Sequence, residues 1–269
     1  MKITLLVNKD IASCIALNRL VPALVEHQLT IGLSAFVGNV ENLHPGLQTL
    51  KFFEQDLFNE LLFPLIDGCH PAPSVELKTF EALGHLAGTK IQEFNAINTG
   101  TDLEKFKESS PDLVISIRYG VILKDVVIEI PKYGVLNLHS GLLPAYKGIM
   151  ATFRAMLNGD KQIGSTLHYI DDHSIDAGPI VGSTYFPVQK SRSYLWHVLQ
   201  LYEAGCQKLI EAVNTLAAGN ELNCVPQIEE GNYYSFPTEA ELSDFMQKGL
   251  SLVESDEILS IARRFLTRY

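Results

Sequence analysis

Residues 135 to 148 read Val-Leu-Asn-Leu-His-Ser-Gly-Leu-Leu-Pro-Ala-Tyr-Lys-Gly. The first five residues are typical of a short buried β-strand, and the proline and glycines that follow indicate a loop. Because side chains alternate along a strand, Asn137 and His139 should point to the same side. The sequence therefore predicts an amide and an imidazole aimed at one point beyond the end of a strand.

A carboxylate about forty residues later can return to the same point. It belongs to Asp176, in the stretch Ile-Asp-Ala-Gly-Pro at residues 175–179. An amide donor, an imidazole and a carboxylate suit the attack of an amine on a carbonyl. The developing oxyanion needs a hydrogen-bond donor, and the amine must lose a proton.

Strand-like and helix-like segments alternate through most of the chain, which predicts βαβ units and an α/β fold with a mostly parallel sheet. Right-handed crossovers would place ligands beyond the carboxyl ends of the strands. The predicted strands cover residues 3–7, 29–37, 89–94, 112–117, 135–139, 164–170 and 180–186. The predicted helices cover residues 11–25, 50–65, 75–86, 149–158 and 193–218.

We expect one catalytic domain over residues 1–220 and a small C-terminal appendage over residues 221–269. Thr238 and Glu241 form a capping-box pattern that opens a helix, and Ser255 is the expected cap of a second helix. Such short elements cannot bury their apolar faces alone. They should pack on the main domain, where they would help to form an acceptor pocket, or on a second subunit in a homodimer.

Composition limits the classes of partner. The chain has 269 residues, of which 46% are hydrophobic and 19% charged, and its formal net charge is −10. A nucleic acid or an anionic membrane is therefore a poor candidate for the principal partner. No apolar run approaches the ~18 residues that span a bilayer.

The first residues start directly as a strand without a signal-peptide pattern, so we expect a cytoplasmic protein. Its cysteines show no C-x-x-C spacing, and we expect neither a metal site nor a disulfide framework. They are Cys14, Cys69, Cys206 and Cys224.

Three motifs occur in a fixed order along the chain. They are N-x-H at residues 137–139, L-L-P-x-Y-x-G at residues 142–148, and a histidine at residue 168 followed by D-A-G-P at residues 176–179. Together they resemble the signature of formyltransferases that use 10-formyltetrahydrofolate. The resemblance is detailed from about residue 112 to residue 181, and the order of elements agrees more loosely over residues 1–215.

The resemblance implies a Rossmann-like domain with helices on both faces of a twisted sheet, which transfers a formyl group from 10-formyltetrahydrofolate, the co-substrate, to an amine. Asn137, His139 and Asp176 match the catalytic set of the family. The folate would lie between two loops, whose matching residues are Tyr119, Gly120, Val121, Ile122 and Leu123 in the first and Ile170, Asp171 and Asp172 in the second.

The chain departs from the family pattern at two places. Ser140-Gly141 stands where Pro-Ser is common, and one extra residue separates His168 from Asp176. Asp171 and Asp172 are therefore competitors for the role of the catalytic carboxylate. We favour Asp176 because the Ala-Gly-Pro that follows it fits the motif.

Other polar residues near the motifs have alternative interpretations. Ser140 and Tyr146 are candidate contacts for the acceptor. Arg118 would hold either an acceptor phosphate or carboxylate, or a structural acid of the protein itself. We interpret His168 as an orienting or core histidine.

The acceptor is inferred by elimination. Residues 7–13 lack the glycine that lets backbone amides approach a phosphate, which disfavours glycinamide ribonucleotide. The short C-terminal part and the net charge of −10 disfavour initiator tRNA. Formyltetrahydrofolate hydrolases carry an extra N-terminal regulatory domain, which we do not expect here, and hydrolysis remains an alternative.

We therefore expect a small-molecule amine, first a nucleotide-linked amino sugar and next a hydroxyornithine-type amine of siderophore synthesis. The non-enzyme alternative is a folate-binding module that has lost its chemistry. A dehydrogenase is disfavoured because no G-x-G-x-x-G follows the first strand.

Overall fold

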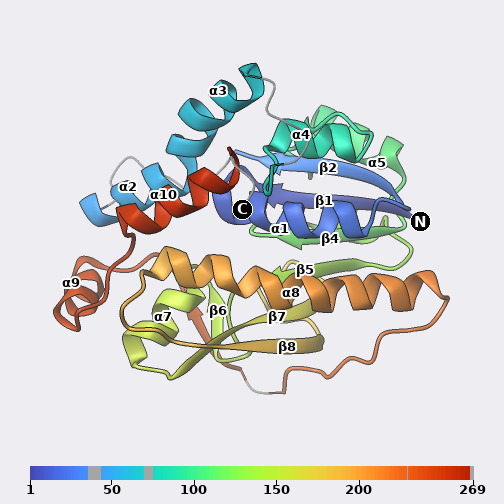
Figure 1. Cartoon of the computed structure of the whole chain (residues 1–269). Coiled ribbons are helices and arrows are strands. Elements are labelled where there is room, and N and C mark those ends of the chain that lie inside the picture. The colour runs from blue at the N-terminus through green and yellow to red at the C-terminus, as the bar shows by residue number, and fades with distance from the viewer. Residues whose placement is uncertain (36–43, 70–74, 229, 267–269) are drawn as a thin grey trace.

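A computed structural model describes residues 1–35, 44–69, 75–228 and 230–266. A seven-stranded sheet forms its centre (Figure 1), and the strand order is β3-β2-β1-β4-β5-β7-β8. Strands β3, β2, β1, β4 and β5 run parallel, β7 is antiparallel to them, and β8 is antiparallel to β7 and so has the same direction as the first five. The predicted mostly parallel α/β sheet is confirmed. The strand bounds are Lys2–Asn8 for β1, Gln28–Ser34 for β2, Gln92–Glu93 for β3, Leu113–Ile117 for β4, Val135–His139 for β5, Gln162–Ile170 for β7 and Ile180–Pro187 for β8.

Helices cover both faces of the sheet, as the Rossmann-like prediction requires. Helices α1 (Ile11–Ala23), α4 (Phe80–Leu86) and α8 (Tyr194–Ala217) pack against one face, and Figure 1 shows α1 and α8 running across it. Helices α5 (Gly100–Ser109) and α6 (Asp125–Ile128) cover the other face. Because side chains alternate along a strand, each face of the sheet has its own hydrophobic cluster. In β4, Ile115 belongs to the cluster under α1, α4 and α8, and Val114 belongs to the cluster under α5 and α6.

Several predicted bounds were wrong for identifiable reasons. The helix predicted from residue 75 begins only at Phe80, because Thr79 caps it by accepting a hydrogen bond from Ala82 N. The preceding residues 75–79 are not helical, and Leu77 N donates instead to Arg264 O at 3.0 Å. The strand predicted over residues 89–94 is reduced to β3. Residues 36 and 37 of the second predicted strand lie outside the described residues.

The helical stretch predicted over residues 50–65 is helical throughout, but its geometry changes twice. It comprises α2 (Pro45–Lys51), the π-helix η1 (Phe52–Leu62) and α3 (Phe63–Gly68). At the end of η1, Phe63 N donates to Phe58 O, five residues earlier. Such wide turns occur frequently at functional sites.

The C-terminal elements pack on the rest of the chain. Strand β9 (Asn232–Tyr234) pairs in parallel with β6 (Tyr146–Gly148), which precedes α7 (Ala151–Asn158). In α9 (Glu239–Gln247), Phe245 stacks on Phe153 of α7 with ring centroids 4.5 Å apart. The capping box of Thr238 and Glu241 is present.

Helix α10 (Ser255–Arg264) is capped by Glu254 without a side-chain bond, so the cap predicted at Ser255 was wrong by one residue. Its anchor is Phe265, whose ring lies 5.0 Å from that of Phe63 and 6.1 Å from that of Phe58, between centroids. In the described part of the chain, no helix combines the length and apolar character needed to cross a membrane.

We predict that Phe265→Ala lowers the free energy of unfolding by about 3–5 kcal/mol, because the ring is fully buried between two others. Urea denaturation followed by circular dichroism measures this loss. Leu266→Ala is the matched control, since its side chain is 59% exposed and should change stability little. Equal effects of the two variants would show that α10 is not anchored by Phe265.

Candidate active site

A cleft of about 460 Å³ lies at the carboxyl ends of the parallel strands. Asn137 and His139 of β5 line it together with Asp176, which lies in the loop between β7 and β8. The residues predicted to contact folate also line it, apart from Asp171. We call this feature the strand-end cleft.

Two strands position the amide of Asn137. Its Cα pairs with that of His168 across β5 and β7, and Asn137 Nδ2 lies 3.0 Å from His168 Nε2. His168 Nδ1 lies 2.8 Å from Tyr169 O, which only accepts, so Nδ1 carries a proton. In the neutral ring, Nε2 then accepts from the amide. His168 is buried and acts on Asn137 as an orienting residue.

The imidazole of His139 is held from one side by backbone. Its Nε2 donates to Tyr146 O at 2.7 Å, and its Nδ1 lies 3.5 Å from Asp176 Oδ2. Since Nε2 is already the donor, attraction between Nδ1 and the carboxylate requires a second proton on the ring. Gly141 permits this packing, because a Cβ there would lie 2.4 Å from Ala151 Cβ and 2.7 Å from His139 Nε2.

The carboxylate of Asp176 joins the network. Gly148 N donates to Oδ2 at 2.8 Å, and Asn137 Nδ2 donates to Oδ1 at 3.4 Å. His168 Nε2 also lies 3.5 Å from Oδ1. Burial raises the pKa of Asp176, but the two histidines and the Gly148 N–H outweigh this effect and lower the pKa to about 2.

The turn that carries Asp176 has a constrained backbone. Asp176 itself has φ 53°, in the left-handed region. A Cβ on Gly178 would lie 2.0 Å from Tyr169 O, so only glycine fits there. Gln227 Nε2 donates to the backbone oxygens of Asp176 at 3.0 Å and of Gly178 at 2.8 Å. A residue from the C-terminal part therefore holds this turn.

The three candidates for the catalytic carboxylate, Asp171, Asp172 and Asp176, occupy different environments in the structure. Asp171 is exposed and does not line the strand-end cleft. Asp172 lines the cleft, but it is exposed and accepts from Ser174 N at 2.6 Å. Of the three, only Asp176 reaches Asn137 and His139.

Tyr146, a predicted acceptor contact, is engaged by other residues of the protein. The hydroxyl of Tyr146 donates to Asp160 Oδ2 at 2.6 Å and accepts from Asn158 Nδ2 at 3.2 Å, and the residue does not line the cleft. Its role here is to offer its backbone oxygen to His139. Ser140, the other candidate, does line the cleft.

Arg118 follows β4 and has φ 56°. Its guanidinium pairs with acidic side chains of the protein itself, as one of its two interpretations from the sequence proposed. Its Nε donates to Asp10 Oδ2 at 3.0 Å, and its Nη2 donates to Glu54 Oε1. Asp10 is fully buried, caps α1 through Ser13 N, and accepts from Asn8 Nδ2. Arg118 thus holds two acids of the protein.

Glu54 lies on η1 and lines the same cleft. Burial raises its pKa, the guanidinium of Arg118 opposes this effect, and the charge of Asp10 raises the pKa further, to about 7 overall. No local sequence pattern indicates Glu54 or Asp10, because the strand order and the π-helix bring them to Arg118. We call Asn8, Asp10, Glu54 and Arg118 the acidic floor.

The C-terminal part also forms a wall of the cleft. Tyr233 of β9 and Phe236 line it. Pairing of β9 with β6 fixes their position, and Ile149 N donates to Tyr234 O at 2.8 Å. Neither residue was predicted from the sequence, because three-residue strands carry no clear periodicity.

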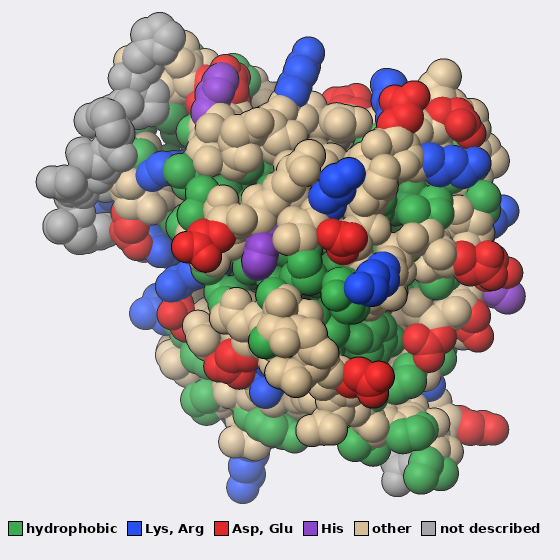
Figure 2. All heavy atoms as spheres, turned by 90° about the vertical axis from the view of Figure 1, so that its right-hand side faces the viewer, with side chains coloured by type: hydrophobic (Ala, Val, Ile, Leu, Met, Phe, Trp, Pro, Cys, Tyr) green, Lys and Arg blue, Asp and Glu red, His purple; other side chains and the backbone are tan. Residues whose placement is uncertain are grey.

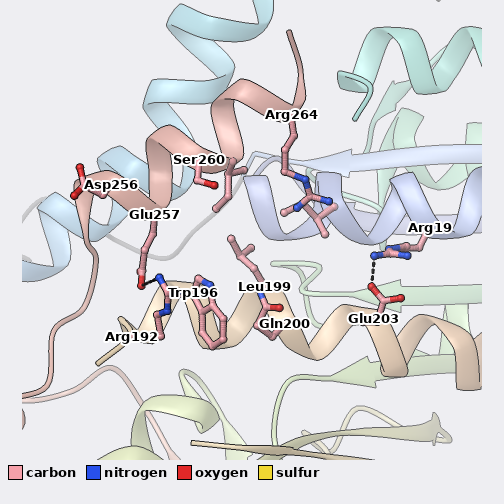
Figure 3. Close-up of a pocket in the computed structure, with 12 residues that line it drawn as sticks. Arg19, Arg192, Trp196, Leu199, Gln200, Glu203, Asp256, Glu257, Ser260 and Arg264 are labelled. Atoms are coloured by element: carbon pink, nitrogen blue, oxygen red, sulfur yellow. Dashed lines mark hydrogen bonds and ion pairs between the residues drawn. The ribbon is translucent and has the colours of Figure 1, made fainter. Parts of the chain in front are cut away.

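A second hollow, of about 270 Å³, lies between α1, α8 and α10 (Figure 3) and holds none of the predicted site residues. Its arginines are paired with carboxylates. Arg19 pairs with Glu203, Arg192 lies 3.5 Å from Glu257, and Arg264 pairs with Glu76. No group of three or more potential metal-ligating side chains occurs among the residues described.

Residues 93–213 match the family model described as "Formyl transferase". The chain contains a formyl transferase domain. The match includes Asn137, His139, His168 and Asp176, the residues that meet in the strand-end cleft.

Known proteins resemble the formyl transferase domain in sequence and in fold. A methionyl-tRNA formyltransferase of Kosmotoga olearia is 34% identical over 140 residues, which are 52% of this chain and 44% of that protein. The chain thus spans less than half of the relative's length. A sugar N-formyltransferase from Shewanella sp. FDAARGOS_354 has a TM-score of 0.55 at 17% identity, over 100% of this chain and 89% of its own.

A third similar structure is an N-formyltransferase from Helicobacter canadensis in complex with folinic acid and dTDP-3-aminofucose. Its TM-score is 0.56 at 16% identity, over 87% of this chain and 71% of its own. At these TM-scores the chain shares the fold of the two structures, and at these identities the likeness shows the fold alone.

The raised pKa of Glu54 predicts a pH-dependent stability. Between its ordinary pKa of 4.5 and about 7, the native protein holds a proton that the unfolded chain has released. The free energy of unfolding should therefore fall as the pH rises through this window. Asp176 acts oppositely but below this window, because its stabilisation is lost as the pH falls from 3.8 towards 2.

Glu54→Gln should flatten this pH dependence, which urea denaturation at several pH values in the window would reveal. Glu60→Gln, an exposed residue of the same π-helix, is the control and should keep the wild-type slope. Equal slopes in the wild type and Glu54→Gln would contradict the prediction.

Proposed function

We propose that the protein transfers a formyl group from 10-formyltetrahydrofolate to a small-molecule amine. The observation that supports this most strongly is the contact network of Asn137, His139, His168 and Asp176 inside one cleft. The network supplies an oriented donor for an oxyanion and an imidazole beside a carboxylate.

The geometry supports a division of roles. One N–H of the Asn137 amide donates to His168 Nε2, and the other makes only a long contact of 3.4 Å to Asp176 Oδ1. That second N–H can turn to an oxyanion on the formyl carbon. A carboxylate with a pKa of about 2 is a weak proton acceptor, so Asp176 acts mainly by stabilising protonated His139.

The reaction then needs one proton to move from the acceptor to the folate. The amine nitrogen attacks the formyl carbon, and the resulting oxyanion accepts from Asn137. His139 gives its proton to the folate nitrogen as the carbon–nitrogen bond breaks. The ring recovers a proton from the attacking amine, so the site ends in its starting charge state.

The walls of the cleft suit the flat aromatic part of a folate. Apolar side chains stand partly exposed on them, including Ile122 at 56% and Ile175 at 38%. Loop residues 119–123 and residues 170 and 172–176 lie on the cleft wall, where the family resemblance places the pteridine. The similar Helicobacter canadensis structure contains folinic acid, a formylated folate.

The acceptor we favour is a nucleotide-linked amino sugar. In support, the structure of the similar sugar N-formyltransferase aligns with the whole of this chain. The net charge of −10 disfavours RNA. Figure 2 shows acidic and basic side chains interspersed over the face it presents. The alternatives are a hydroxyornithine-type amine, hydrolysis of the folate, and transfer to methionyl-tRNA as in the curated relatives.

The proposal is tested by tetrahydrofolate release from 10-formyltetrahydrofolate with a panel of amines. The panel contains dTDP- and UDP-linked amino sugars, hydroxyornithine, glycinamide ribonucleotide, methionyl-tRNA and a control without acceptor. We expect release that depends on an amino sugar. Release without any acceptor would establish hydrolysis instead, and folate binding without release under every condition would favour a binding module.

We predict that His139→Ala and Asp176→Asn each lower turnover by roughly two orders of magnitude or more, because each removes part of the proton-transfer pair. Initial rates of tetrahydrofolate release measure this. Asp171→Asn is the matched control, because this aspartate is exposed outside the cleft and should retain activity. Near-wild-type rates in either active-site variant would refute the assigned roles.

A further inference from the structure

The acidic floor lies beside the proposed catalytic residues. Strands β1, β4 and β5 are neighbours, and the Cα of Ser116 on β4 pairs with that of Asn137 on β5. Arg118 follows Ser116 by two residues, and Asn8 ends β1. Because neighbouring strands lie about 4.8 Å apart, this floor is within reach of a small molecule that reacts at Asn137.

The charges of this floor are unusual for a subsite that would take a phosphate. Among the described residues that line the cleft, the Lys and Arg side chains are Lys51 and Arg118. Lys51 pairs with Asp56 at 2.6 Å, and Arg118 is shared by Asp10 and Glu54. A phosphate here would face the carboxyl group of Glu54 without an unpaired Lys or Arg to neutralise it.

Glu54 has unused hydrogen-bonding capacity. Its Oε1 accepts from Arg118 Nη2. Among the described residues, no side chain or backbone group donates a hydrogen bond to its Oε2. A carboxylate can accept about four hydrogen bonds, and a buried charge is normally fully paired. The pKa raised to about 7 is consistent with a carboxylate whose burial is incompletely compensated.

The π-helix explains why two consecutive polar residues face the cleft. Glu54 and Gln55 both line it, and both are 8% exposed. The wider turn of a π-helix brings successive side chains closer in direction than an α-helix does. Two adjacent polar side chains directed into the cleft can both bind a polar ligand, whereas an apolar ligand would gain nothing from them.

We propose that Glu54 is the acceptor-recognition residue of this site. It binds a hydroxyl or amino group of the amine acceptor, in a subsite that excludes phosphate. This inference rests on the proposed formyl transfer and narrows its substrate class: the part of the acceptor next to the reacting amine is a polyhydroxy or polyamino group, and any phosphate lies away from the floor.

The test compares Glu54→Gln with Glu60→Gln, the exposed residue of the same helix. The probes are dTDP-3-aminofucose, glucosamine, hydroxyornithine and glycinamide ribonucleotide, and KM and kcat are measured for each amine that the wild type formylates. We expect Glu54→Gln to raise the acceptor KM about 10- to 100-fold, as loss of a charged hydrogen bond does. The kcat and the affinity for folinic acid should stay near wild type.

Inorganic phosphate gives a second test on the unchanged protein. We expect no competition between millimolar phosphate and a phosphate-free amine acceptor in the wild type. An unchanged acceptor KM in Glu54→Gln, a parallel loss of folinic acid affinity, or competition by phosphate would each overturn the inference while leaving formyl transfer intact. Failure of the wild type to formylate any amine would overturn the proposed function, and this inference with it.

Discussion

Asp176 places a negative charge in a buried position where the sheet ends, and several separate parts of the chain compensate it. The carboxylate accepts from Gly148 N at the end of β6, and it lies within 3.5 Å of both site histidines. Burial alone would raise its pKa, yet these partners lower the pKa to about 2. The site is therefore built around one ionised group, and its neighbours are oriented by their contacts with it.

The C-terminal part of the chain belongs to this arrangement physically. Gln227 holds the left-handed turn of Asp176, and β9 pairs with the strand that contains Gly148. Tyr233 and Phe236 complete a wall of the cleft. We therefore infer that residues 221–269 form part of the acceptor pocket, in agreement with one of the two roles expected for them from the sequence.

Where local periodicity controls the structure, the sequence predicted it well. Alternation in β5 predicted that Asn137 and His139 share a side, and the repeated strand and helix patterns predicted the parallel sheet. Asp176 could be chosen over Asp171 and Asp172 only by the motif that follows it, and the contacts agree with that choice. Arg118 could not be interpreted, because its partners Asp10 and Glu54 come from segments far away in sequence.

The partners of Tyr146 could not be predicted for a related reason. Its hydroxyl is taken by Asp160 and Asn158, residues whose approach depends on the turn after α7. The late start of α4 is likewise accompanied by a tertiary contact, the hydrogen bond from Leu77 N to Arg264 O. Long-range pairing of this kind leaves no periodic signal in a single sequence.

The central claim is that a formyl carbon passes directly from the folate to an amine within the strand-end cleft. It is tested most directly with 10-formyltetrahydrofolate labelled with ¹³C at the formyl carbon, incubated with the protein and an amino-sugar acceptor. We predict that the label appears in an N-formyl group of the acceptor, as seen by NMR and by mass spectrometry. Label recovered only as formate, or retained on the folate with every amine tested, would contradict the account.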